Sequence, residues 1–107
     1  MTLQEMASFV MKVNAENGWF DKTRTFGEDV ALLHSEVSEM LEAFREMDMV
    51  DTLEPSGKPI GVGSEAADIL IRLLDTCYRY GIDLEKQFHI KMNYNKTRGY
   101  RHGGKAL

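Results

Sequence analysis

The sequence has one cysteine, two prolines and no long run of apolar residues. Because Cys77 stands alone, one chain can form neither an internal disulfide nor a zinc site made only of thiolates, and we expect Cys77 to pack in the core. No window approaches the roughly 18 apolar residues of a membrane span. The start, Met1 to Glu5, lacks the basic and apolar segments of a signal peptide. We therefore expect a soluble, cytoplasmic protein.

Acidic residues are missing from the end of the chain. The 107 residues carry a formal net charge of -4, which argues against a nucleic-acid polymer as partner. After Glu85 the chain has no Asp or Glu, but it has six lysines and arginines: Lys86, Lys91, Lys96, Arg98, Arg101 and Lys105. This asymmetry suggests a metal site beside a phosphate site, although it also occurs in proteins with neither. The length fits one domain, 1–107, with a core small enough that we expect an oligomer.

The apolar periodicity predicts an all-α fold with little strand content. Thr2 and Glu5 have the spacing of a capping box at the start of the first helix. Ser64 and Asp83 are expected to cap the third and fourth helices. The predicted helices span 2–17, 26–47, 64–80 and 83–97, with a connector at 19–22, a loop at 48–63 and a basic, glycine-containing tail at 98–107.

Two pairs of carboxylates, each three residues apart, lie on the second and third predicted helices. At about 100° per residue, Glu36 and Glu39 fall on the shoulder of an apolar stripe, where they should repel each other and be poorly solvated. Glu65 and Asp68 lie on the only polar stripe of the next helix, which alone is explained equally well as a face turned to water. The apolar stripe of the second helix is Val30, Leu33, Val37, Met40, Leu41 and Phe44.

The two pairs together indicate a cation site. The loop between the helices is short enough to force antiparallel packing, so the four carboxylates can converge. Oxygen ligands without His or Cys suit Mg²⁺, with Mn²⁺ as a substitute. Because Mg²⁺ usually completes its shell with waters and substrate phosphates, such a site points to phosphate chemistry.

The chain resembles the MazG-like all-α nucleoside triphosphate pyrophosphohydrolases. The motifs that carry the resemblance are Ser35-Glu-Val-Ser-Glu-Met40, Ser64-Glu-Ala-Ala-Asp-Ile69, the run from Phe26 to Glu36, and the ending Tyr100-Arg-His-Gly-Gly-Lys105. The resemblance implies a four-helix core that assembles as a homodimer or a dimer of dimers. It also implies Mg²⁺-dependent cleavage of the bond between the α and β phosphates, with a nucleoside monophosphate and pyrophosphate as products.

The resemblance also implies roles for individual residues. Glu36, Glu39, Glu65 and Asp68 match the metal ligands of the family, and Glu39 or Glu36 is the candidate catalytic carboxylate that orients the attacking water. Lys91, Asn95 and Arg98 match positions that contact the substrate, although a solvated basic face is the alternative. Arg101 and Lys105 in the tail could fold over the phosphates or belong to a frayed terminus. Trp19 could stack on a base or cap the end of the bundle.

Two other functions stay open at this point. The first is a phosphoribosyl-ATP pyrophosphohydrolase, which would use the same carboxylates. The second is a metal-binding or helix-pairing module without catalysis. The preferred base, the sugar and the choice between dimer and tetramer are not fixed by the sequence.

Overall fold

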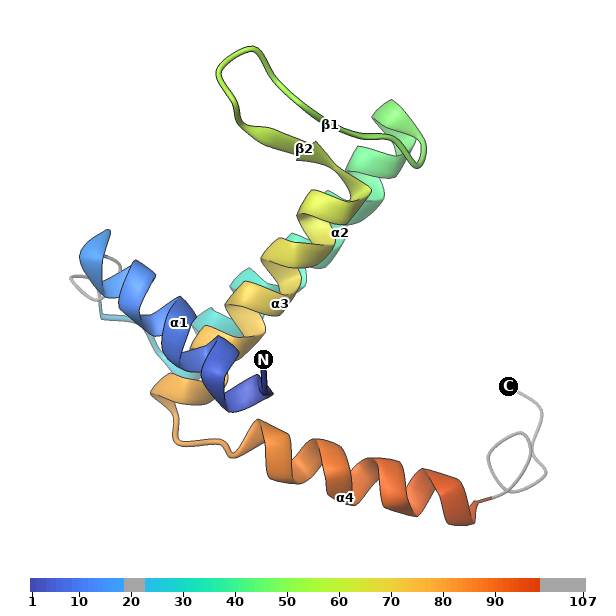
Figure 1. Cartoon of the computed structure of the whole chain (residues 1–107). Helices are drawn as coiled ribbons and strands as arrows, with labels where there is room; N and C mark the ends of the chain where they lie inside the picture. The colour runs from blue at the N-terminus through green and yellow to red at the C-terminus, as the bar shows by residue number, and fades with distance from the viewer. Residues whose placement is uncertain (19–22, 99–107) are drawn as a thin grey trace.

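The computed structural model describes residues 1–18 and 23–98. These residues form four helices and a small two-stranded hairpin (Figure 1), namely α1 (Leu3–Glu16), α2 (Phe26–Met47), β1 (Asp51–Leu53), β2 (Pro59–Gly61), α3 (Val62–Arg79) and α4 (Leu84–Thr97). The helices match the four predicted segments closely, which confirms the mainly helical class. In the described ranges, no helix is both long enough and apolar enough to cross a membrane.

Side chains fix the start of three helices. The predicted capping box of α1 is confirmed, because the Glu5 amide donates to Thr2 Oγ1 at 3.0 Å and the Thr2 amide donates to Glu5 Oε1 at 2.9 Å. Thr25 and Glu28 form the same arrangement at α2. Asp83 caps α4 as expected by accepting from the Lys86 amide at 3.0 Å.

The predicted cap of α3 is wrong. Its N-cap is Gly61, with no side-chain cap, and Ser64 lies inside the first turn, where its hydroxyl donates to the Pro59 carbonyl at 3.2 Å. The helix begins earlier because β2 runs directly into it. Asp51 of β1 caps the first turn of α3 instead, because its Oδ1 accepts a hydrogen bond from the Gly63 amide at 2.7 Å.

The segment 48–63 was expected to be a loop, but it contains an antiparallel hairpin. Thr52 lies opposite Ile60, and the turn is closed by a hydrogen bond of 2.8 Å from the Glu54 amide to the Lys58 carbonyl. Gly61 has a φ of 124°, and a Cβ at this position would collide with the Val50 carbonyl oxygen. Only glycine satisfies both the backbone conformation and the close approach. The hairpin is thereby held against the start of α3.

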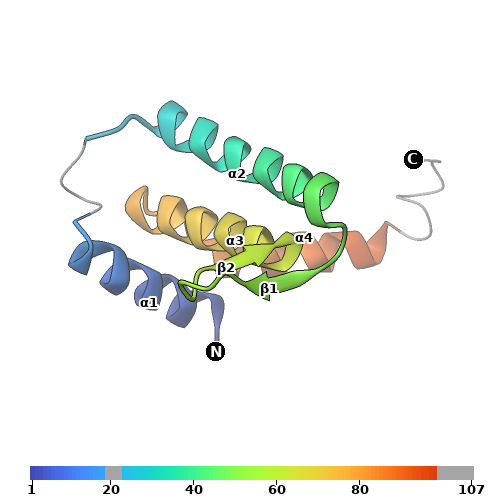
Figure 2. The same cartoon turned by 90° about the horizontal axis from the view of Figure 1, so that it is seen from above.

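The helices α1, α2 and α3 form the body of the molecule, with α3 between the other two (Figures 1 and 2). The helices α2 and α3 run antiparallel, as the short connection predicted. Ala7 and Val10 from α1 pack on Leu74 from α3, and Leu84 at the start of α4 adds to this cluster. Cys77 is buried, which confirms its expected place in the core.

A buried polar network holds the start of α2 against the end of α3. Arg24 Nε lies 2.7 Å from Asp29 Oδ1, and the Tyr80 hydroxyl donates to Asp29 Oδ2 at 2.7 Å. Burial alone would raise the pKa of Asp29, but the hydrogen bonds from Tyr80 and Arg24 lower it overall. The Phe26 ring packs edge-on against Tyr80 at 4.9 Å between centroids. These contacts join α2 and α3 at the end of the helix pair opposite to the hairpin.

The last helix leaves the body of the chain. Leu84 and Glu85 are half-buried, and the Leu3 amide donates to Glu85 Oε1 at 3.0 Å. Every residue of α4 after Glu85 is exposed. The radius of gyration is 16.6 Å, against about 13 Å for a compact domain of this length. A single chain is therefore extended, and its helices do not close into one bundle.

Candidate metal centre

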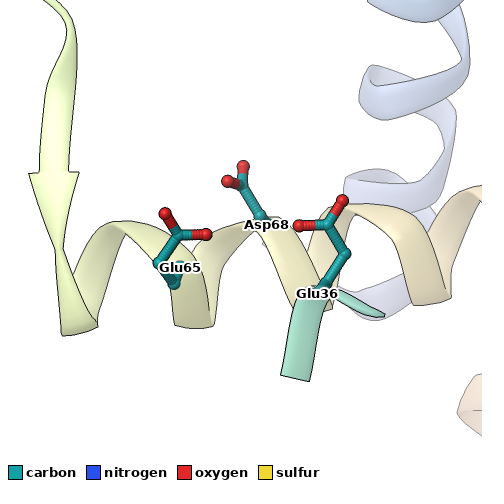
Figure 3. A group of neighbouring side chains, drawn as sticks. All are labelled: Glu36, Glu65 and Asp68. Atoms are coloured by element: carbon teal, nitrogen blue, oxygen red, sulfur yellow. The ribbon is translucent and has the colours of Figure 1, made fainter. Parts of the chain in front are cut away.

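Three carboxylates meet where α2 passes α3. Glu36 comes from α2, while Glu65 and Asp68 come from successive turns of α3 (Figure 3). One oxygen from each lies within 4.8 Å of the others, and we call these three residues the carboxylate cluster. Glu36 and Glu65 are half-buried and Asp68 is exposed. The antiparallel packing thus brings together three of the four residues expected to hold a metal.

Glu39, the fourth expected ligand, lies beside the cluster rather than in it. It is one turn beyond Glu36 on α2, and its side chain is exposed. Hydrogen bonding to Glu36 and the negative charge of Glu36 raise the pKa of Glu39 above its usual value. Glu39 is therefore coupled to the cluster through Glu36, at its solvent side.

The cluster is electrostatically strained. Burial, followed by the charge of Asp68, raises the pKa of Glu65, and burial, followed by the charge of Glu36, raises the pKa of Asp68. Among the described residues, the buried Glu65 Oε2 has no hydrogen-bond partner. A buried oxygen without a partner, beside two further carboxylates, is a favourable position for a cation.

Arg72 supplies a positive charge to one side of the cluster. Its Nη2 and Nε lie 3.2 and 3.3 Å from Glu36 Oε1, and both side chains are largely buried. This ion pair joins α3 to α2. The arginine contacts the cluster from the α3 turn that follows Asp68.

Asp75 is structural rather than part of the cluster. It is 2% exposed, its Oδ2 lies 3.1 Å from Arg79 Nε, and its Oδ1 accepts from Asn14 Nδ2 at 3.3 Å. Arg79, one turn further along α3, is thus the ion-pair partner of Asp75 on its own helix. The contact between Asn14 and Asp75 joins α1 to α3, two turns after Asp68 along α3.

Lys58 is a candidate site residue that the sequence analysis missed. It ends the hairpin turn, and its charge opposes the rise in the pKa of Glu65 and Asp68. Its ammonium group therefore lies within electrostatic reach of the cluster. The only available signal was a lysine in a glycine-containing turn four residues before a helix start, which is too common to be specific.

Two depressions adjoin the cluster. The first, which we call the acidic pocket, has a volume of about 380 Å³ between the hairpin, α2 and α3. Its lining includes five carboxylates, Glu39, Glu42, Glu46, Glu54 and Glu65. The second, of about 450 Å³, is an apolar groove between α1 and α3. Its lining is Met6, Phe9, Val10, Val13, Leu70, Ile71 and Leu74, together with the polar Asn14 and Asp68. Asp68 therefore belongs to both the cluster and the apolar groove.

The expected substrate-binding residues of α4 do not lie with the cluster within one chain. Lys91 and Asn95 are exposed on α4. This helix follows the end of α3, whereas the hairpin precedes the start of α3, so α4 and the hairpin lie at opposite ends of α3 (Figure 1). Arg98 caps the end of α4, and its guanidinium lies 5.4 Å from the centre of the Tyr94 ring. Trp19, Arg101 and Lys105 lie outside the described residues.

The site therefore offers a set of oxygen donors in the carboxylate cluster, a neighbouring carboxylate, Glu39, that can accept a proton, and an adjoining apolar groove. Searches against protein-family models, curated proteins and solved structures found no match to this chain.

Proposed function

We propose that the protein is a Mg²⁺-dependent nucleoside triphosphate pyrophosphohydrolase, which converts a ribo- or deoxyribonucleoside triphosphate to the monophosphate and pyrophosphate. The observation that carries the proposal is the convergence of Glu36, Glu65 and Asp68 from two antiparallel helices. Their spacing is the one on which the resemblance to MazG-like enzymes rests. The oxygen-only donor set favours Mg²⁺, with Mn²⁺ as a substitute.

The cluster fits a resident cation by its own chemistry. Glu65 Oε2 is buried without a partner among the described residues, and burial, followed by neighbouring negative charge, raises the pKa of Glu65 and of Asp68. We propose that these two residues and Glu36 hold the ion, while Arg72 fixes the position of Glu36. When bound, Mg²⁺ polarises the α-phosphate and neutralises the charge that develops on the pyrophosphate.

Glu39 is proposed as the proton acceptor for the attacking water. It lies at the exposed side of the cluster, and Glu36 raises the pKa of Glu39 toward the range in which a carboxylate accepts a proton more readily. The sequence left open whether Glu39 is a ligand or a base. Its exposure and its position outside the three converging oxygens favour the base.

The surroundings supply binding surfaces for the rest of a nucleotide. The apolar groove adjoins Asp68 and suits a flat, largely apolar group such as a nucleobase, with Asn14 as a polar contact. Lys58 on the hairpin suits a phosphate oxygen. These surfaces do not select a particular base or sugar.

The decisive experiment is a panel of ribo- and deoxyribonucleoside triphosphates incubated with Mg²⁺, with pyrophosphate measured separately from orthophosphate. The native chain should release pyrophosphate. Glu39→Gln should retain the helical circular dichroism spectrum and lose activity on the order of 100-fold or more. Glu16→Gln, an exposed change on α1, is the matched control and should remain active. Full turnover by Glu39→Gln would overturn the role assigned to Glu39.

Two alternatives are separated by the same panel. Turnover of phosphoribosyl-ATP without turnover of simple triphosphates favours a phosphoribosyl-ATP pyrophosphohydrolase. Mg²⁺ binding without turnover of either favours a non-catalytic helical module, for which the exposed apolar residues of α2 and α4 provide a pairing surface. The same exposed residues support a homodimer or homotetramer in each case.

A further inference from the structure

The two oxygens of the Glu36 carboxylate have different surroundings. Both Nη2 and Nε of Arg72 donate to the same oxygen, Oε1, at 3.2 and 3.3 Å. Figure 3 shows one Glu36 oxygen directed toward Asp68 and Glu65 and the other directed away from them. Because Oε1 already accepts two charge-assisted hydrogen bonds, Oε2 is the oxygen that Glu36 can give to a cation. Sharing both oxygens with one ion would require the loss of those two bonds.

Burial keeps the ion pair between Arg72 and Glu36 formed. The two side chains are 16% and 14% exposed. Separating a buried pair leaves a charge without compensation, which is strongly destabilising. The ion pair between Arg45 and Glu42 differs, because its atoms are 3.6 Å apart and the side chains are 65% and 60% exposed. Glu36 is therefore held in one orientation by a contact that water does not readily replace.

The positive charge of Arg72 also reaches a second member of the carboxylate cluster. Asp68 lies one turn before Arg72 on α3, and the guanidinium opposes the rise in the pKa of Asp68 that burial and Glu36 cause. A cation in the cluster is accordingly repelled by this guanidinium. The repulsion depends on the charge of the ion, so it does not distinguish one divalent ion from another.

Mg²⁺ and Ca²⁺ carry the same charge but use carboxylates differently. Mg²⁺ requires near-ideal octahedral geometry at about 2.0–2.1 Å and usually keeps several waters. Ca²⁺ takes about six to eight oxygens at about 2.3–2.6 Å, and it accepts both oxygens of one carboxylate. A glutamate that offers one oxygen therefore meets the needs of Mg²⁺, whereas it deprives Ca²⁺ of a ligand.

We propose that Arg72 is a positioning residue that makes the carboxylate cluster selective for Mg²⁺ over Ca²⁺, because it holds Oε1 of Glu36 and leaves Oε2 for the ion. The proposal rests on the metal site of the proposed function but does not depend on hydrolysis. Since both ions have the same charge, loss of the guanidinium charge strengthens the binding of each by nearly the same factor. The ratio of the two dissociation constants thus reports how many oxygens of Glu36 bind the ion.

The test is isothermal titration calorimetry of the metal-free chain with Mg²⁺ and, separately, with Ca²⁺, without nucleotide. Arg72→Met removes the charge and every hydrogen-bond donor of the side chain. In this variant the dissociation constant of Ca²⁺, divided by that of Mg²⁺, should fall by about tenfold or more, as is typical when a group that orients a metal ligand is lost. Arg72→Gln keeps a neutral polar group beside Glu36 and should change the ratio in the same direction. Either variant decides the question if it keeps the helical circular dichroism spectrum of the native chain.

Arg45→Met is the matched control, because it makes the same change at an exposed arginine of α2 and should leave both dissociation constants unchanged. An unchanged ratio in a folded Arg72 variant, even with both constants altered, would overturn the proposal and leave the proposed function standing. A lowered ratio, in a chain that hydrolyses no triphosphate, would refute the proposed function and leave the role of Arg72 standing. A native chain that binds neither ion would overturn both.

Discussion

Replacing Glu65 by glutamine removes one negative charge from the carboxylate cluster and nearly keeps the volume of the side chain. One oxygen of Glu65 lies within 4.8 Å of an oxygen of Glu36 and of Asp68. At 4.8 Å, two unit charges repel by about 0.9 kcal/mol in water and by about 3.5 kcal/mol at an effective dielectric constant of 20. Because Asp68 is exposed, we take the lower part of this range.

Without metal, Glu65→Gln should therefore be more stable than the native chain by about 1 kcal/mol, which raises the thermal midpoint by about 4–8 °C. With Mg²⁺ the order should reverse. At a Mg²⁺ concentration 100 times its dissociation constant, the native chain gains about 2.7 kcal/mol, and the variant, which lacks one ligand, gains far less.

The assay is thermal unfolding followed by circular dichroism, with and without Mg²⁺. The protein concentration is held constant, because assembly also affects the midpoint. Glu16→Gln is the control and should respond to Mg²⁺ as the native chain does. A loss of stability in metal-free Glu65→Gln, or an equal response of variant and native chain to Mg²⁺, would refute the account of the cluster.

Three further predictions concern the hairpin and the pH dependence. Lys58→Gln should raise KM for the nucleotide by about tenfold with a smaller effect on kcat, because one charge-assisted contact to phosphate is lost; an unchanged KM in steady-state kinetics would remove Lys58 from the site. Folding raises the pKa of Glu65 and Asp68 above the ordinary values of 4.5 and 3.8, so the folded chain binds more protons and these groups lose their stabilising contribution as the pH rises. In a chelator, the thermal midpoint of unfolding should accordingly fall as the pH rises above the ordinary pKa values of these two groups, and Mg²⁺ should abolish the fall; a rise of the midpoint would contradict the raised pKa of Glu65 and Asp68. Gly61→Ala should cost more than about 1 kcal/mol in denaturant unfolding, because φ is positive there and the Val50 carbonyl occupies the space of a Cβ; an unchanged midpoint would show that the hairpin does not hold the start of α3.

The helices could be predicted because their signals are local. The capping box of Thr2 and Glu5 and the cap of Asp83 depend on residues three positions apart, and both are present. The hairpin could not be predicted in the same way, because strands of three residues are too short to show alternation. The cap expected at Ser64 failed because Asp51, twelve residues away from Gly63, holds the first turn of α3 instead.

The candidate site was predicted to the extent that helix spacing determines it. The three-residue spacing put Glu36 on the side of α2 that meets Glu65 and Asp68 of α3. The ion pair of Arg72 with Glu36 depends on side-chain conformations across two helices, which no periodicity determines. The resemblance to MazG-like enzymes assigned Lys91 and the carboxylates to one site. Within one chain they lie apart, because α4 extends away from the cluster (Figure 1).

The proposed Mg²⁺-dependent cleavage between the α and β phosphates can be followed directly by ³¹P NMR of a nucleoside triphosphate mixed with the native chain, first in a chelator and then with Mg²⁺. In the chelator the spectrum should not change. After Mg²⁺ is added, the triphosphate signals should be replaced by those of a monophosphate and pyrophosphate in equal amounts. Release of orthophosphate and a diphosphate, or an unchanged spectrum from protein that has bound Mg²⁺ with every triphosphate of the panel, would contradict the proposed function.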